Sequence, residues 1–193
     1  GKTLKIIEEL KIPDNVVLVG MIGRLHPEKG PRWLVEAANI LRDRNIHFIF
    51  AGDGPQRKEI EALISGYGLT DRVHLLGFRD DVANILEQLD LLVIPSESES
   101  FGNVALEAML MGAPVVAANV GGLKEIISDG VDGIFVEPKN PDMIALNIVK
   151  LIENEKLRKN ISSRGKQKVV SYFNIKRVVD EIEQVYEGLI HAM

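Results

Sequence analysis

Short apolar runs rich in β-branched residues alternate along this chain with longer amphipathic stretches, and this alternation limits the choice of fold most strongly. The runs are almost wholly apolar, as expected of strands that are buried on both faces. Strands that alternate with helices form βα units, and such units build a parallel sheet. We predict strands at residues 16–22, 47–51, 73–77, 91–95, 114–118 and 133–137.

The stretches between these runs have helical patterns, and strands stop after Pro141. We predict helices at residues 31–44, 55–67, 80–88, 103–111 and 122–128, and three further helices at 141–153, 155–172 and 175–190. The predicted fold class is α/β, a doubly wound parallel sheet with a helical C-terminal tail. The chain forms one domain in this interpretation, with a linker and first helix at 1–15, the core at 16–140 and the tail at 141–193.

Composition excludes several classes of partner. A chain of 193 residues with 46% hydrophobic content can bury one sizeable core. The net charge is −5 and no basic block occurs, so nucleic acid is not expected as a partner. No apolar run approaches the roughly 18 residues of a membrane span. We therefore expect a soluble, cytoplasmic protein.

The chain contains no cysteine, which excludes disulfides, thiolate metal sites and cysteine nucleophiles and fits a reducing compartment. Gly1 is not a natural initiator residue, so we expect the chain to be part of a longer protein. The sequence leaves open whether that longer protein associates with a membrane.

The loops that leave the predicted strands are the places to look for chemistry, because ligands of such sheets bind outside the carboxyl ends of the strands. The loop GRLHPEKG at residues 23–30 carries Arg24 and Lys29. The planar guanidinium of an arginine and the mobile ammonium of a lysine together suit a diphosphate. The alternative is two ordinary solvated cations. The loop AGDGP at 51–55 is neither a Walker A loop nor a GxGxxG fingerprint, and it indicates a close backbone approach or a plain turn.

Two later loops carry further candidates. In LGFRDDV at 76–82, Phe78 could pack against a base or in the core, and Asp80 or Asp81 could cap the next helix. In the loop that follows the predicted strand at 91–95, Gly102 precedes a helical pattern. The amides around Gly102, Asn103 and Val104 would form a helix N-terminus, which attracts phosphate.

Glu107 is the one ionisable residue between Phe101 and Val120. Its neighbours in ALEAMLM are all apolar, so we expect a helix with no polar face and a buried carboxylate. Such a group needs hydrogen-bond donors, and the paired hydroxyls of a ribose would supply them. The alternative is that Glu107 lies on the solvent face of an amphipathic helix.

Glu99 and Glu107 form an E-x7-E pair inside SESESFGNVALEAMLMGAPVVAANVGG. This segment resembles the signature of the retaining, nucleotide-sugar-dependent glycosyltransferases of group 1, also called family 4. GRLHPEKG, AGDGP, LGFRDDV, the VGGLKEIISDGVDGIFVEP segment and the closing helices resemble successive blocks of the same family, in the same order. The resemblance covers nearly the whole chain from Val16 to Ile190.

The resemblance implies the C-terminal, donor-binding half of a GT-B enzyme, whose N-terminal acceptor domain is absent from this chain. It implies a nucleoside diphosphate sugar, UDP- or GDP-linked, as donor, with no cofactor and no metal. The four histidines show no ligand spacing, in agreement with this. The acceptor would be a glycan, a lipid or a small molecule, as in polysaccharide biosynthesis. The isolated domain is expected to be inactive.

The family's site residues transfer to this sequence by motif. Arg24 and Lys29 would hold the donor diphosphate and, with Glu99, form the catalytic set. Glu99 would bind hydroxyls of the transferred sugar, and Glu107 would bind the ribose. The remaining nucleotide-sugar contacts would come from Gly77, Phe78 and Arg79 near the base, and from Phe101, Gly102, Asn103 and Val104 near sugar and phosphate.

Two other functions share parts of this pattern. A nicotinamide-dependent dehydrogenase would have the same alternation of strands and helices, but the first strand lacks GxGxxG. A non-catalytic sugar-nucleotide-binding module would keep the fold and lose transfer. The presence of Arg24, Lys29, Glu99 and Glu107 argues against that loss.

Overall fold

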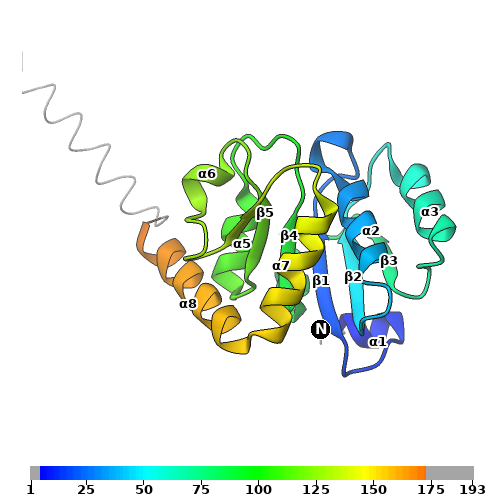
Figure 1. Ribbon diagram of the computed structural model, residues 1–193, viewed down its shortest axis with the longest axis horizontal. Coiled ribbons are helices and arrows are strands. Elements are labelled where there is room, and N and C mark those ends of the chain that lie inside the picture. The colour runs from blue at the N-terminus through cyan, green and yellow to red at the C-terminus, as the bar shows by residue number, and fades with distance from the viewer. Residues whose placement is uncertain (1–4, 173–193) are drawn as a thin grey trace, which may run out of the picture.

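The computed structural model describes residues 5–172 of the chain, which form a six-stranded parallel sheet covered by helices on both faces (Figure 1). The strands are β1 (Val17–Ile22), β2 (Ile46–Ala51), β3 (Val73–Gly77), β4 (Leu91–Ile94), β5 (Val115–Ala118) and β6 (Ile134–Val136). The helices are α1 (Ile6–Leu10), α2 (Pro31–Ile40), α3 (Arg57–Gly66), α4 (Val82–Gln88), α5 (Asn103–Met111), α6 (Leu123–Ile126), α7 (Pro141–Glu153) and α8 (Glu155–Tyr172), with a 3-10 turn η1 (Pro27–Lys29).

The sheet has the strand order β3-β2-β1-β4-β5-β6, and every neighbouring pair runs parallel. All six predicted strands are confirmed, with ends that differ by at most one residue. The interior strands β4 and β5 are buried at every position, as their continuous apolar sequences require. The order reverses between β1 and β4, which makes that junction the topological switch point of the sheet.

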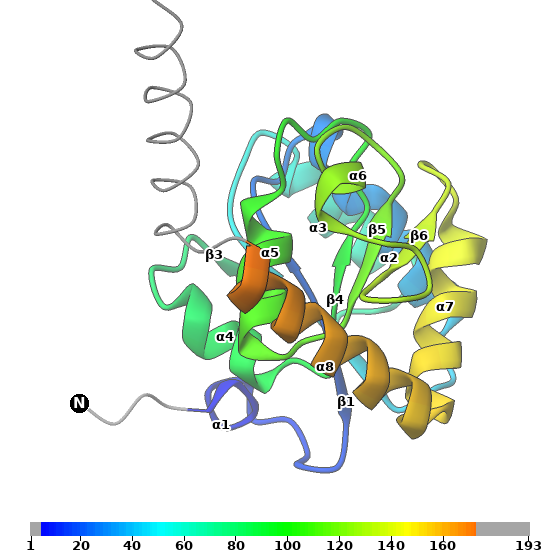
Figure 2. The ribbon, with the colours of Figure 1, turned by 90° about the vertical axis from the view of Figure 1, so that its left-hand side faces the viewer.

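Helices form a layer on each face of the sheet. On one face, α2 packs against α3 and α7, over a core cluster that includes Leu34, Ile60 and Ile148. On the other face, α4 and α5 lie over a cluster that includes Ile85 and Met109. The tail helix α8 packs against α5 and α7 at the side of the sheet, as the quarter-turned view shows (Figure 2). The fold is a Rossmann-like three-layer α/β sandwich.

Most predicted helices are confirmed, and their ends show where the sequence pattern was misleading. Helix α2 ends at Ile40 instead of residue 44, because the chain turns through residues 41–45 into β2. Helix α6 keeps only Leu123–Ile126 of the predicted 122–128. The predicted helix at 175–190 lies outside the described residues.

The buried His47 and the partly buried His74 form a polar pair across β2 and β3. His47 Nδ1 and His74 Nε2 lie 2.9 Å apart, and the two rings stack with centroids 5.2 Å apart. Burial lowers the pKa of both rings, and the charge of a protonated His47 lowers it further at His74, to about 4. The pair is therefore neutral in the folded protein at pH 7.

This pair predicts a loss of stability in mild acid. The unfolded chain binds protons near the ordinary histidine pKa of about 6.5, whereas folded His74 does so only near pH 4. The free energy of unfolding should therefore fall as pH drops from about 6.5 to about 4, by about 1 to 3 kcal/mol. Urea unfolding at pH 7.5, 5.5 and 4.5 measures this, and His74→Gln should flatten the decline. An equal decline in both proteins would contradict the assignment.

Candidate functional site

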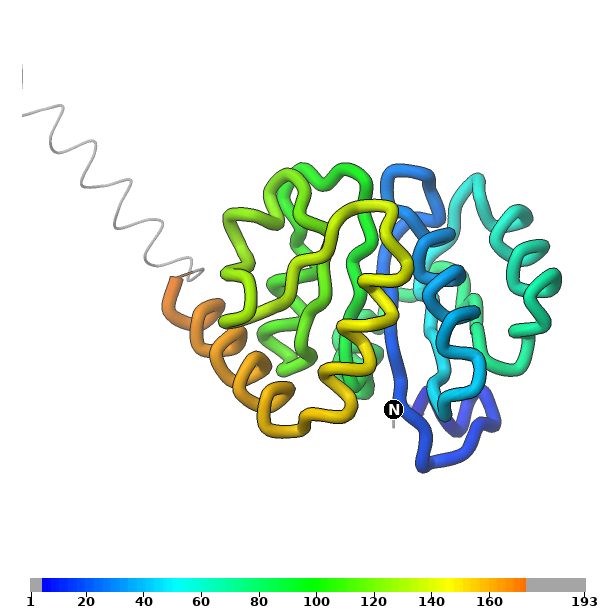
Figure 3. Tube along the Cα trace, in the orientation of Figure 1, coloured from blue at the N-terminus to red at the C-terminus, as the bar shows by residue number. Residues whose placement is uncertain are grey.

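The loops at the carboxyl ends of the strands gather at one end of the sheet, as the Cα trace shows (Figure 3). A pocket of about 320 Å³ opens there at the switch point. Strands β1 and β4 pair only as far as Gly20 and Leu92, and the residues beyond that pair, Met21–Ile22 and Val93–Ile94, line the pocket. The pocket therefore lies where the two strands part, the position at which doubly wound sheets bind ligands.

Lys29 and Glu99, which both line this pocket, form an ion pair. Lys29 Nζ lies 2.5 Å from Glu99 Oε2, with side-chain exposures of 25% and 11%. The buried hydroxyl of Ser96 lies 3.5 Å from the same carboxylate oxygen. The backbone joins the two loops, because Glu97 N donates to Glu28 O at 2.7 Å. This contact brings together a cation and an anion that are 70 residues apart in sequence.

The amino end of α5 forms another wall of the pocket. Gly102 adopts a φ of 102° at the N-cap position, and no side chain caps this helix end. Asn103 and Val104, the first helical residues, line the pocket, and the exposed Phe101 lies at the same wall. An uncapped helix N-terminus presents N–H groups and a partial positive charge. Together with Lys29, it suits an anionic group such as a phosphate.

Close backbone packing fixes Glu99. Gly122 N donates to Glu99 O at 2.9 Å. Gly121 has a φ of 48°, and a Cβ there would lie 1.8 Å from Glu99 O. No other residue type fits this position without a shift of the loop. This positioning role of Gly121 was not predicted, since VGG entered the sequence pattern only as part of the family resemblance, and the contact of Ser96 was not predicted either.

A second pocket, of about 280 Å³, adjoins the first and shares Ile22 and Gly23 with it. Arg24, Phe78 and Arg79 line this second pocket. Arg24 and Lys29 therefore lie in neighbouring pockets and do not converge on one. Phe78 is 82% exposed, which removes the alternative that it is a core aromatic.

Two glycine contacts hold the loops of the second pocket together. A Cβ at Gly52 would lie 1.9 Å from Gly23 O, and one at Gly54 would lie 2.4 Å from Leu25 O. The glycines of AGDGP thus permit a close backbone approach, the first of the two interpretations left open by the sequence. Asp81 occupies the N-cap position of α4, but its side chain makes no capping hydrogen bond, so the predicted cap is wrong.

The prediction that Glu107 is buried is wrong. Helix α5 buries Ala105, Ala108 and Met109, while Glu107 faces solvent. The pattern misled because apolar residues also lie on the outer side of α5, where Leu110 is 39% exposed. Glu107 lines a depression of about 240 Å³ between α4 and α5, which shares Val82 with the second pocket. It remains next to the candidate site, but as an accessible carboxylate.

Glu97, which follows β4, forms an ion pair with Lys139 and a hydrogen bond with Trp33 of α2. Glu97 Oε2 lies 2.8 Å from Lys139 Nζ, and Trp33 Nε1 donates to Glu97 Oε1 at 3.0 Å. These contacts, with Lys139 first, hold the pKa of Glu97 below its usual range. Within residues 5–172, no group of three or more His, Cys, Asp and Glu could hold a metal ion. Among the same residues, no helix is long and apolar enough to cross a bilayer.

The strand order and the pocket at the switch point define a Rossmann-like domain, a class of fold that binds its ligands at that position. The family model for glycosyl transferases group 1 matches residues 2–168, and the chain belongs to this family. An uncharacterized glycosyltransferase of Methanocaldococcus jannaschii is 37% identical over 94% of this chain and 47% of its own length. The chain thus spans about half the length of the relatives it matches.

Two solved structures place the chain within the GT-B fold. Anabaena HepE in complex with UDP is 31% identical with a TM-score of 0.88, over 95% of this chain and 52% of HepE. The C-terminal domain of LpcC, a group 1 protein from Francisella tularensis, is 30% identical with a TM-score of 0.80, over 91% of this chain and 95% of that domain. This chain therefore has the fold of the C-terminal domain of a group 1 glycosyltransferase.

Proposed function

We propose that this chain is the donor-binding domain of a retaining glycosyltransferase, which transfers a sugar from a nucleoside diphosphate sugar to a glycan, lipid or small-molecule acceptor. The observation that carries the proposal is the Lys29–Glu99 pair beside the uncapped end of α5, at the switch point of the sheet. The cation and the amides suit a diphosphate, and the carboxylate suits sugar hydroxyls.

The diphosphate lies between the two pockets in this proposal. Lys29 reaches it from the first pocket and Arg24 from the second, since the pockets meet at Ile22 and Gly23. As the bond to the sugar breaks, negative charge grows on the departing nucleoside diphosphate. Lys29, Arg24 and the amino end of α5 neutralise that charge, which is their catalytic role. The proposal includes no cofactor and no metal ion.

The transferred sugar lies in the first pocket, where Glu99 accepts hydrogen bonds from its hydroxyls. The amides of Phe101, Gly102 and Asn103 contact sugar and phosphate. The acceptor enters on the face from which the nucleotide leaves, so the configuration of the sugar is retained, as the family resemblance implies. Glu107 lies outside this pocket and is not a nucleophile in the reaction.

The nucleoside occupies the second pocket. The base lies against the backbone of Gly77, Phe78 and Arg79. The ribose lies near Val82, which lines both the second pocket and the depression that holds Glu107, and its hydroxyls donate hydrogen bonds to Glu107. The exposure of Glu107 supports this role, because a ligand can reach the carboxylate without a change in the fold. The UDP complex of HepE makes UDP the first choice of nucleotide, with GDP as the alternative.

Acceptor selection belongs to the part of the relatives that this chain does not cover, an N-terminal acceptor domain in this proposal. A chain without cysteine fits the reducing cytoplasm, and we place the reaction there, at the inner face of a membrane where the acceptor is a lipid.

Thermal unfolding of the chain with UDP, GDP, ADP and their sugar conjugates tests the proposal. A ligand that binds only the folded state raises the melting temperature, by an amount that grows with its concentration relative to Kd. We expect one nucleoside diphosphate series to raise it, with about 2.7 kcal/mol of added stability at 100 times Kd. Adenosine and uridine without phosphates serve as controls. The absence of a shift with every diphosphate would contradict the proposal.

A further inference from the structure

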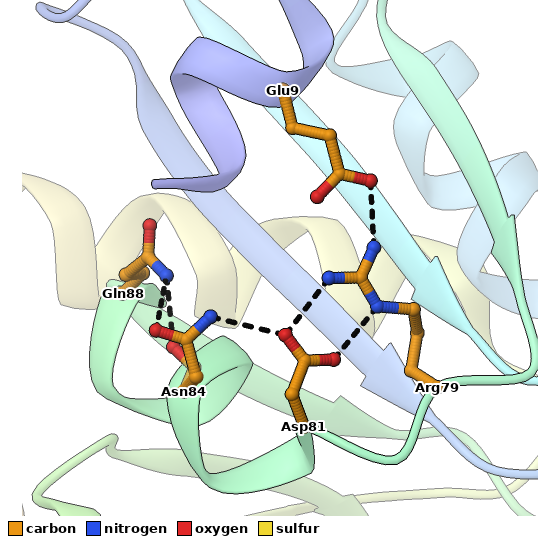
Figure 4. A network of polar contacts seen from close by, with 5 residues as sticks. All are labelled: Glu9, Arg79, Asp81, Asn84 and Gln88. Carbon is orange, nitrogen blue, oxygen red and sulfur yellow. Dashed lines mark hydrogen bonds and ion pairs between the residues drawn. The ribbon is translucent and has the colours of Figure 1, made fainter. Parts of the chain in front are cut away.

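A network of polar contacts joins α1 to α4 at both ends of α4. It consists of Ile6, Glu9, Arg79, Asp81, Asn84 and Gln88, and is called the α1–α4 network below. Ile6 N, at the first position of α1, donates to Gln88 Oε1 at 2.7 Å. Gln88 Nε2 donates to Asn84 O at 2.9 Å, and Asn84 Nδ2 donates to Asp81 Oδ2 at 3.2 Å. Arg79 closes the network between Asp81 and Glu9 (Figure 4).

All three nitrogens of the Arg79 guanidinium donate hydrogen bonds within this network. Its Nε and Nη2 atoms donate to the two carboxylate oxygens of Asp81 at 2.7 and 2.8 Å, and Nη1 donates to Glu9 Oε1 at 2.6 Å. This fork is the geometry that only arginine provides. The hydrogen bonds hold the pKa of Asp81 down at about 2 and raise the pKa of Arg79. Both groups are therefore charged at neutral pH.

Asp81 serves this network instead of its own helix. An aspartate at an N-cap position ordinarily accepts a hydrogen bond from a backbone N–H of the first turn, which stabilises the helix by about 1 kcal/mol. At α4 that capping bond is absent, and the carboxylate faces Arg79 and Asn84. The loop between β3 and α4 is therefore shaped by contacts that extend to α1.

The same loop forms a wall of the second pocket, because Phe78 and Arg79 line it. Helix α1 has five residues, far fewer than an isolated helix needs to be stable. It is held by the burial of Ile6 and by the α1–α4 network. A change in the docking of α1 therefore alters the contact between Glu9 and Arg79. Because Arg79 lines the second pocket, the wall of that pocket changes with it.

We propose that Arg79 is a positioning residue for the nucleoside, which couples the docking of α1 to binding in the second pocket. This inference rests on the proposed function, since it takes the second pocket as the nucleoside site. Its side chain acts through Glu9 and Asp81, and it does not itself hydrogen-bond the base. Because coupling is reciprocal, nucleotide binding must also stabilise the docked α1.

Glu9→Gln tests the coupling at a residue that does not line the pocket. Titration calorimetry compares UDP with inorganic pyrophosphate, which needs only the diphosphate contacts and no base. We expect Glu9→Gln to weaken UDP binding about 5- to 10-fold and to leave pyrophosphate binding unchanged. Glu8→Gln is the matched control, since Glu8 is an exposed acid on the same helix, and it should match the wild type with both ligands.

Hydrogen exchange gives a second measurement that a purely structural role would not change. UDP should slow exchange at the amides of Glu8 and Glu9, which donate to Lys5 O in docked α1, and pyrophosphate should not. Arg79→Lys keeps the charge but loses the fork, and it should abolish this slowing. Equal UDP affinity in Glu9→Gln and wild type, or equal losses for UDP and pyrophosphate, would overturn the inference. A wild-type chain that binds pyrophosphate but not UDP would instead refute the nucleotide site itself.

Discussion

The 193-residue chain is expected to bind a nucleotide sugar and not to transfer the sugar to an acceptor at an enzymatic rate. The chain spans about half the length of its relatives, and both proposed donor pockets open at the exposed edge of the sheet. Without a second domain the acceptor is not held against the donor. Proximity and orientation account for roughly 7 to 11 kcal/mol of a barrier, which corresponds to a rate loss of roughly 10⁵- to 10⁸-fold.

Mass spectrometry of the chain incubated with its best-binding sugar nucleotide and candidate acceptors measures this loss. Binding is confirmed first by calorimetry, so that a missing product reflects missing transfer. Slow hydrolysis of the donor is expected, because water reaches a site that no other domain closes. Transfer at about 1 s⁻¹ or faster, the range of complete enzymes, would show that this domain carries the whole activity.

Lys29→Ala is expected to weaken binding of a nucleoside diphosphate by about 1.5 to 3 kcal/mol, or roughly 10- to 150-fold. The variant removes a charge-assisted contact and leaves Glu99 facing the diphosphate without its counterion. The fold should tolerate the change, because Glu99 lines the open pocket, where water can solvate its carboxylate once Lys29 is removed. Calorimetric titration measures the affinity, and thermal unfolding without ligand measures the stability.

Three further variants separate this role from a general effect of charge. Arg24→Ala should weaken diphosphate binding through the second pocket. Lys139→Ala removes an exposed cation at the same edge of the sheet, which pairs with Glu97 and lines neither pocket, and should bind as the wild type does. Glu99→Gln should strengthen binding of the diphosphate without sugar, since Lys29 no longer pairs with a carboxylate. Equal affinity in Lys29→Ala and wild type would remove Lys29 from the site.

The strands could be predicted from the sequence because each is short, almost wholly apolar and bounded mostly by glycine, proline or polar residues. A strand buried on both faces holds few polar side chains, so its length can be read from the run of apolar residues, as in β4 and β5. The helix ends were less visible. Residues 41–44 continue a helical pattern but form the turn into β2, where the path of the chain overrides the local preference.

The site could be predicted in part, because its loops follow the strands directly. Lys29 and Glu99 were both named, but the contact between them depends on a backbone hydrogen bond from Glu97 to Glu28, which no local pattern encodes. The error at Glu107 has a physical cause. Apolar neighbours were taken as evidence of burial, whereas α5 carries apolar side chains on its exposed side as well. Exposure depends on the layers packed around a helix, and the sequence of that helix alone does not give it.

The position of the main pocket between β1 and β4 links ligand binding to local unfolding of the domain. Strands β1, β2 and β3 follow one another along the chain, as do β4, β5 and β6. The two halves meet along β1 and β4 and through the packing of α2 against α7. A ligand held at once by Lys29 from the first half and by the end of α5 from the second bridges this junction. Separation of β1 from β4 at the pocket then requires dissociation of the ligand, so the bound domain resists local opening there.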